Sequence, residues 1–104
     1  MTRSVRWSER AAADLEVIRQ FLSLSSDATA TTWIAKLMQA GDSLDDLSER
    51  DRRVPEWDAP DIRELVVRPY RLVYRLVDHE VVVLTVFDGH RLLPVEAMVE
   101  PGRQ

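Results

Sequence analysis

The sequence predicts an α+β domain in which a helical hairpin packs on an antiparallel-rich sheet, in the order β-α-α-β-β-β. Three observations lead to this prediction. Two segments in the first half repeat apolar residues at spacings of three and four, which is typical of amphipathic helices. Runs in the second half alternate in polarity or are continuously β-branched, as strands are. The chain has 104 residues, so we expect residues 1–104 to form a single domain.

The first half is expected to form a short strand and two helices. Residues 3–7 alternate weakly and are interpreted as the strand. A first helix is predicted over about residues 8–22, with Ser8 as its N-cap. Asp27 is expected to cap a second helix that continues to residue 47. This helix has an unbroken apolar face, formed by Ala30, Trp33, Leu37, Ala40, Leu44 and Leu47. The short connection makes the two helices an antiparallel hairpin.

The second half is expected to supply the sheet. Residues 48–61 are interpreted as a connector, because two prolines exclude a regular central strand or helix there. Strands are predicted over residues 62–67, 70–77 and 81–87, and the last two form the centre of the sheet. Residues 70–77 alternate strictly, so Tyr70 and Tyr74 are expected to face the core, while Arg71 and Arg75 point the other way.

Composition excludes several kinds of protein and site. The chain has no cysteine, which rules out disulfides and thiolate metal sites, and its two histidines are too few for a catalytic zinc without carboxylates. No apolar run approaches the roughly twenty residues of a membrane span, and the first residues lack a signal-peptide core. We therefore expect a cytoplasmic protein that binds neither membrane, metal nor cofactor.

Charge is distributed unevenly along the chain. The formal net charge is −4, yet residues 62–75 contain four arginines and only Glu64 as an acidic residue. An acidic protein with a local arginine cluster can meet a phosphate group there, but it will not coat nucleic acid non-specifically.

Three segments, in this order and spacing, resemble the RelE/ParE superfamily of bacterial toxins, and are closest to the ParE-like plasmid-stabilisation toxins. Residues 5–18 resemble the opening of these toxins, which typically consists of a strand, an alanine-rich turn, and then Asp-Leu and an isoleucine. The second match consists of residues 53–56, 62–65 and 70–75, and the third of residues 86–94. The resemblance covers residues 5–94 and agrees with the β-α-α-β-β-β order derived from periodicity.

The resemblance implies a growth-inhibiting toxin that forms a hetero-oligomer with a cognate antitoxin. ParE-like members poison DNA gyrase, whereas RelE-like members cleave mRNA in the ribosome without a metal. The antitoxin is expected to bury apolar surface near Trp33, Leu37 and the connector residue Trp57. Trp57 has an alternative role as a lid over the edge of the core.

The resemblance also implies candidate residues for RNA cleavage. Arg71 and Arg91 occupy the positions of two arginines used by RelE-like enzymes, and Arg63 aligns with a basic residue of the preceding strand. Three such arginines on one sheet face would clamp a phosphate, and His90 would transfer the proton. The alternative is that Arg71 faces solvent, Arg91 pairs with a carboxylate and His90 is an ordinary loop residue.

Two features of the sequence distinguish between the two targets: a missing tyrosine and the acidic net charge. RelE-like enzymes carry a tyrosine after the last strand, but residues 95–99 contain none. Nucleases that enter the ribosome tend to be basic, and this chain is acidic. Both observations favour a ParE-like toxin with a gyrase-type target over a ribosome-dependent mRNA endonuclease. A third hypothesis, from another class, is a non-toxic protein-interaction module.

Overall fold

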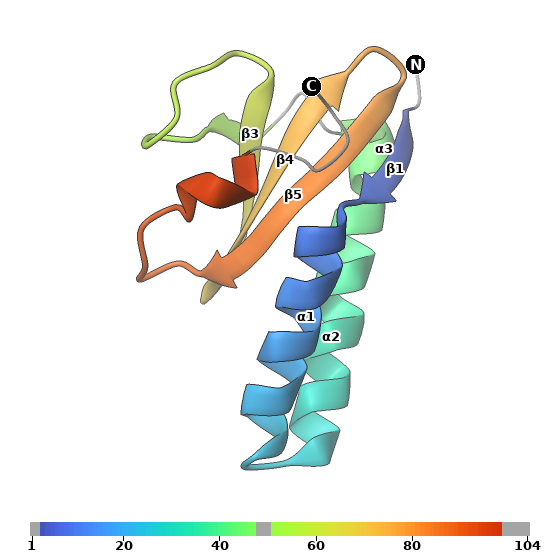
Figure 1. Cartoon of the computed structure of the whole chain (residues 1–104). Coiled ribbons are helices and arrows are strands. Elements are labelled where there is room, and N and C mark those ends of the chain that lie inside the picture. Colours follow the sequence, from blue (N-terminus) through green and yellow to red (C-terminus); the bar gives the residue numbers. More distant parts are fainter. Residues whose placement is uncertain (1–2, 48–50, 99–104) are drawn as a thin grey trace.

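The computed structural model describes residues 3–47 and 51–98 (Figure 1). A helical hairpin lies against a five-stranded sheet and projects beyond one end of it (Figure 1). The elements in chain order are β1 (Ser4–Trp7), α1 (Glu9–Ser23), α2 (Asp27–Asp42), α3 (Leu44–Leu47), β2 (Arg52–Arg53), β3 (Ile62–Val67), β4 (Tyr70–Val77), β5 (Glu80–Asp88) and the 3₁₀ helix η1 (Val95–Met98). The predicted α+β class and element order are therefore confirmed.

Serine side chains cap both helices of the hairpin. The Oγ of Ser8 accepts a hydrogen bond from the backbone N–H of Ala11 at 3.0 Å, as the sequence predicts. The second cap is Ser26, whose Oγ accepts from the N–H of Thr29 at 3.1 Å. The prediction that Asp27 is the cap was wrong by one residue: Asp27 is the first residue of α2 and adds negative charge to its first turn.

The second predicted helix is divided in the structure. Helix α2 ends at Asp42, and Ser43 bends the chain while its hydroxyl donates to the carbonyl of Ala40 at 2.6 Å. Gly41 lies directly against β1, because a Cβ atom at this position would be 2.3 Å from Cζ2 of Trp7. The apolar periodicity continues across this break into α3, so periodicity alone could not reveal it.

The sheet has the strand order β1-β5-β4-β3-β2, with β5 and β4 near its centre as predicted. β1 pairs with β5 in parallel, and the other neighbours are antiparallel. The short strand β2 lies at the edge of the sheet, in the segment interpreted as a connector, which agrees with the exclusion of a regular central strand there. It pairs Arg52 with Glu64 and Arg53 with Arg63, and two residues are too few for an alternating pattern to show.

Hydrophobic residues are buried on both faces of the sheet. Tyr70, Leu72 and Tyr74 face the helical hairpin, as predicted. On the opposite face, Val73 belongs to a second core cluster with Val54 of the connector. Leu93 and Met98, from the segment after β5, complete the covering of this face. The face that strand alternation assigned to solvent is thus buried wherever the connector and η1 fold over it.

None of the helices within residues 3–47 and 51–98 is long and apolar enough to cross a membrane.

Candidate functional site

The sheet separates two of the arginines that the sequence analysis placed together. In the β3–β4 pair, Arg63 lies opposite Tyr74 and Val66 lies opposite Arg71. Residues directly opposite in an antiparallel pair share a face, so Arg63 is on the face of the helical hairpin and Arg71 is on the other face. The predicted convergence of these arginines on one face was therefore wrong. Arg63 instead donates to the carbonyls of Asp51 and Pro60, at 3.0 Å each.

Arg71 is the centre of a buried ion-pair network. Its Nε donates to Oε1 of Glu64 at 2.7 Å, and its two Nη atoms donate to the carboxylate of Glu56 at 2.8 and 2.7 Å. The side chain of Glu64 is 0% exposed and also pairs with Arg52. The Arg71 guanidinium stacks over the ring of Phe87, 4.9 Å from the ring centroid. All three guanidinium nitrogens are thus engaged by carboxylates, and Arg71 neither faces solvent nor presents a free phosphate-binding fork.

Glu56 joins this network to the segment that follows β5. Besides Arg71, its carboxylate accepts a hydrogen bond from the backbone N–H of Leu93 at 3.2 Å. The hydrogen bonds from Arg71 are the main cause of a pKa of about 2 for Glu56. Burial of the carboxyl group acts in the opposite direction and raises the pKa, and the hydrogen bond from the Leu93 N–H lowers it further. The same pairing raises the pKa of Arg71. Glu56 therefore fastens the connector to β4 and to the chain after β5.

The lowered pKa of Glu56 predicts a loss of stability in acid. A carboxylate whose folded-state pKa is depressed stabilises the fold above its unfolded-state pKa, and this contribution is lost as the pH falls from 4.5 towards about 2. We expect Glu56→Gln to lower the free energy of unfolding by about 2 kcal/mol at pH 7 and to flatten its decline below pH 5. Urea titrations between pH 7 and pH 2 measure this, with the exposed Glu9→Gln as control. Equal slopes for wild type and Glu56→Gln would contradict it.

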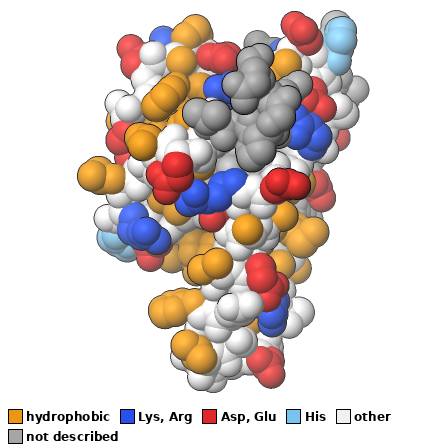
Figure 2. Space-filling model, in the orientation of Figure 1, with side chains coloured by type: hydrophobic (Ala, Val, Ile, Leu, Met, Phe, Trp, Pro, Cys, Tyr) orange, Lys and Arg blue, Asp and Glu red, His pale blue; other side chains and the backbone are white. Residues whose placement is uncertain are grey.

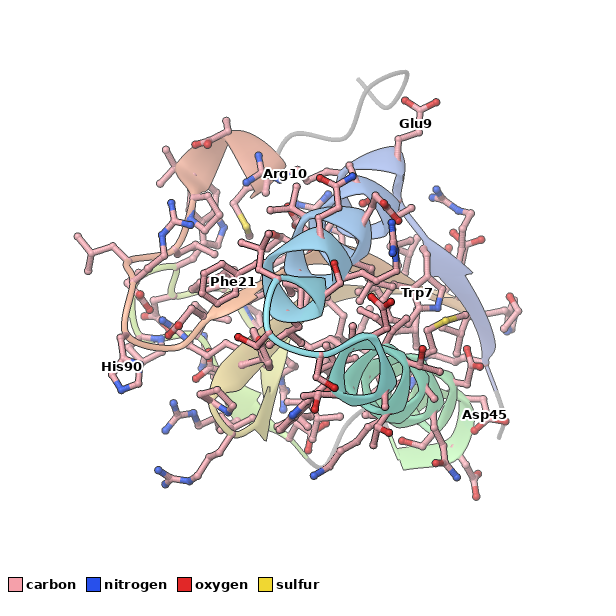
Figure 3. The ribbon with its side chains drawn as sticks, turned by 90° about the horizontal axis from the view of Figure 1, so that it is seen from below. Trp7, Glu9, Arg10, Phe21, Asp45 and His90 are labelled. Atoms are coloured by element: carbon pink, nitrogen blue, oxygen red, sulfur yellow. The ribbon has the colours of Figure 1, made fainter. Side chains whose placement is uncertain are left out.

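His90 and Arg91 follow the end of β5 but line different pockets. Oδ1 of Asp88 accepts the backbone N–H of His90 at 2.9 Å and lies 2.8 Å from its Nδ1. The backbone hydrogen bond is the largest cause lowering the pKa of Asp88. The His90 side chain is 86% exposed and lies at the edge of the molecule (Figure 3). It lines a pocket with Arg71, whereas Arg91 lines a separate pocket beside α1.

The pocket that contains His90 will be called the basic pocket. It has a volume of about 660 Å³ and lies where the β3–β4 turn meets the end of β5. Its lining includes Arg52, Val66, Arg68, Tyr70, Arg71 and His90. It therefore holds two of the four residues that the sequence analysis named for RNA cleavage.

The second pocket has a volume of about 300 Å³ and lies between α1 and the segment after β5. It is called the apolar groove because most of its lining is apolar, although the charged residues Arg10, Asp14, Asp88 and Arg91 also line it. Its walls are Val17 and Phe21 on the helix and Leu92 and Pro94 on the segment, and its floor comprises Ile18, Tyr70, Val86 and Phe87. Phe21 is 69% exposed, and Figure 3 shows it on the outer side of α1. Figure 2 shows other hydrophobic side chains exposed along the projecting part of the hairpin. Such a surface fits an apolar partner segment.

A half-buried carboxylate holds α1, one wall of the apolar groove, against β5, which contributes to its floor. Asp14 of α1 accepts the backbone N–H of Val86 at 3.1 Å and the hydroxyl of Thr85, both on β5. It also pairs with Arg10 at 2.9 Å, one turn earlier on α1. These bonds fix α1 against β5, so the fold itself sets the position of the α1 wall relative to the floor of the groove.

The residues expected to bind an antitoxin do not line this groove. Leu37 is 0% exposed and packs in the core, so the structure removes it from the predicted partner surface. Trp33 packs edge-on against Tyr70 with ring centroids 5.5 Å apart, and Lys36 lies over its ring. Trp57 is partly exposed on the connector, where it pairs with Val54.

Sequence reasoning missed the groove residues on α1, although the sequence contains a signal for them. Val17, Phe21 and Leu24 recur at spacings of four and three, which defines a second apolar stripe beside the buried one. A helix with one buried and one exposed apolar stripe has more apolar surface than its own fold covers. The wall on the other side, formed by Leu92, lies 71 residues after Phe21 and could not be paired with it by periodicity.

Comparisons with known proteins agree with this fold. A ParE–ParD toxin–antitoxin system of P. aeruginosa superposes with a TM-score of 0.71 and 21% identity, covering 84% of this chain and 96% of that one. The RelBE2 toxin–antitoxin complex of Mycobacterium tuberculosis superposes with a TM-score of 0.62 and 20% identity, covering 85% and 99%. A comparison with curated proteins gives no match. The family model described as "ParE toxin of type II toxin-antitoxin system, parDE" matches residues 5–93. The chain therefore belongs to the ParE toxin family of type II toxin–antitoxin systems.

Proposed function

We propose that this protein is a growth-inhibiting toxin of the cytoplasm, and that its cognate antitoxin neutralises it by seating an apolar segment in the apolar groove. We base this binding site on the exposure of Phe21 and Leu92, which lie on opposite walls of the groove above a floor of buried residues. The two solved structures described above come from toxin–antitoxin systems, which supports an antitoxin as the partner. The groove binds this segment by burying apolar surface.

The target that we propose is of the gyrase type. The supporting observation is the neutralisation of Arg71 by Glu56 and Glu64. RNA cleavage through the 2′-hydroxyl needs cationic donors that are available to the charged phosphorane. Arg71 would have to leave two carboxylates to serve, and Arg63 lies on the opposite face of the sheet. The net charge of −4 further disfavours entry into an RNA-lined site.

Ribosome-dependent mRNA cleavage is the second candidate. The observation that favours it is the presence of Arg71 and His90 in the same pocket. In this candidate, Glu56 releases Arg71 when RNA binds, Arg71 and Arg91 contact the scissile phosphate, Arg63 assists, and His90 transfers the proton. No metal or cofactor takes part in this reaction.

Induction of the chain alone, without antitoxin, tests the proposal. We expect growth arrest, loss of supercoiling by purified gyrase on addition of the protein, and unchanged mRNA 5′ ends. Co-expression with the antitoxin should restore growth. New codon-linked mRNA ends with intact supercoiling would replace the gyrase proposal by the second candidate. Normal growth on induction would contradict the toxin proposal altogether and favour a non-toxic interaction module.

A further inference from the structure

One arginine of the basic pocket lacks the partners that the other basic side chains of the pocket have. Arg52 pairs with Glu64, Arg71 with Glu56 and Glu64, and His90 with Asp88. Arg68, exposed in the turn between β3 and β4, makes no ion pair or hydrogen bond with any residue of 3–47 or 51–98. The pocket therefore presents one uncompensated guanidinium.

Apolar side chains as well as basic ones line the pocket around Arg68. Val66, which is 39% exposed, and Pro69 and Tyr70 line the same pocket. An ion pair formed beside apolar side chains is better shielded from water than one on an open surface. A ligand for this pocket accordingly combines one negative group with an apolar neighbour.

The charge balance distinguishes a carboxylate from a nucleic-acid backbone. Arg52 and Arg71 are paired with the carboxylates of Glu56 and Glu64, whereas Arg68 has no such partner, so the three arginines carry one positive charge more than these two carboxylates. Binding of nucleic acid depends on several cations that each neutralise a phosphate. A single available guanidinium instead matches one aspartate or glutamate side chain, which it binds through two parallel hydrogen bonds.

We infer that the basic pocket is the surface that recognises the protein target, and that it binds an acidic segment of that target. One carboxylate of the segment pairs with Arg68, and an adjacent apolar side chain contacts Val66 and Tyr70. This inference rests on the proposed toxin function, and it specifies which surface of the toxin contacts the target and which kind of segment of the target binds there. Tyr70 lines both the basic pocket and the apolar groove, so antitoxin and target bind side by side. Arg68 lines only the basic pocket and Phe21 only the groove, which makes the two surfaces separable by mutation.

Charge reversal of Arg68 tests the inference. Arg68→Glu, Arg68→Lys and wild type are induced without antitoxin, and colony-forming units are counted. The control Arg19→Glu makes the same charge change on α1, outside the lining of both pockets. For each purified toxin, the Kd for the antitoxin is measured by calorimetry and the Tm by thermal unfolding. Like charges that face each other across an interface weaken binding strongly. We therefore expect Arg68→Glu to be about 100-fold less toxic than wild type, as counted in surviving colony-forming units. Its antitoxin Kd and Tm should remain those of wild type. Arg19→Glu should be as toxic as wild type, whereas Arg68→Lys, which keeps the positive charge but cannot form two parallel hydrogen bonds, should be intermediate in toxicity.

Each other result overturns the inference in an identifiable way. Wild-type toxicity in Arg68→Glu would show that the basic pocket does not contact the target. Parallel loss of toxicity and antitoxin binding would show one shared surface. New mRNA ends that disappear in Arg68→Glu would assign the pocket to RNA phosphate. A wild-type chain that leaves growth unaffected would contradict the proposed function itself, and the target surface with it.

Discussion

Replacing Arg71 by alanine is expected to lower the free energy of unfolding by about 3–5 kcal/mol, because it removes one partner of a buried ion-pair network. Glu64, with a side chain that is 0% exposed, would keep only Arg52, whose own side chain lies mostly in solvent. Glu56 would lose the guanidinium that holds it over β4. Loss of the stacking contact with Phe87 adds to the effect. Urea unfolding at pH 7 measures it.

Arg75→Ala provides a matched control for this substitution. Arg75 lies on the same strand as Arg71, but its ion pair with Asp61 has a longer distance of 3.6 Å and is more exposed. We expect Arg75→Ala to cost less than about 1 kcal/mol. If Arg71→Ala were no more destabilising than Arg75→Ala, the network would not hold the connector. A loss of toxicity in Arg71→Ala consequently indicates catalysis only when the variant is as folded as wild type.

The second large effect concerns the apolar groove. Phe21→Glu should weaken antitoxin binding by about 2–4 kcal/mol, or roughly 30- to 1,000-fold in Kd, because it places a charge on an apolar wall that the antitoxin covers. The free energy of unfolding should change by less than about 0.5 kcal/mol, since the Phe21 side chain is mostly exposed in the free protein. Calorimetric titration of the purified chain with antitoxin gives the Kd.

Two further variants determine which surface the antitoxin uses. Met38→Glu introduces the same charge at an exposed hydrophobic residue of α2 that does not line the groove, and it should bind antitoxin normally. Trp57→Ala tests the connector surface that the sequence predicted. Strong binding by Phe21→Glu together with weak binding by Trp57→Ala would place the antitoxin on the connector and contradict the groove.

Helices and strands of this fold were predictable where apolar and polar residues recur at a regular spacing over several helical turns or strand residues. The strand at 62–67 and the strand at 70–77 have the predicted bounds, and the strand at 81–87 is longer by one residue at each end. Ser8 caps the first helix as expected, because capping is a local interaction over three residues. The break at Ser43 and the short strand β2 were missed, since contact with Trp7 and pairing with Glu64 join residues that are distant in sequence.

The residues of the candidate site were likewise predicted only in part. The sequence singled out Arg71 and His90, which do line one pocket, but it also grouped them with Arg63, which the pleat of the sheet places on the opposite face. It contained no sign that Glu56, fifteen residues before Arg71, neutralises that arginine. A residue pattern indicates which side chains are charged, whereas the availability of a charge depends on which oppositely charged groups lie within about 4 Å.

By itself, then, the sequence determined the α+β class, the hairpin and the resemblance to RelE/ParE toxins, because periodicity and ordered motifs are properties of neighbouring residues. The tertiary structure decided that Leu37 is core, that Arg71 is enclosed by carboxylates, and that Phe21 and Leu92 face each other across a groove. The first outcome depends on how the hairpin packs on one face of the sheet, and the other two depend on how the connector and the segment after β5 fold back over it. That folding brings together residues far apart in the chain, and only the packed molecule specifies which of their surfaces remain accessible.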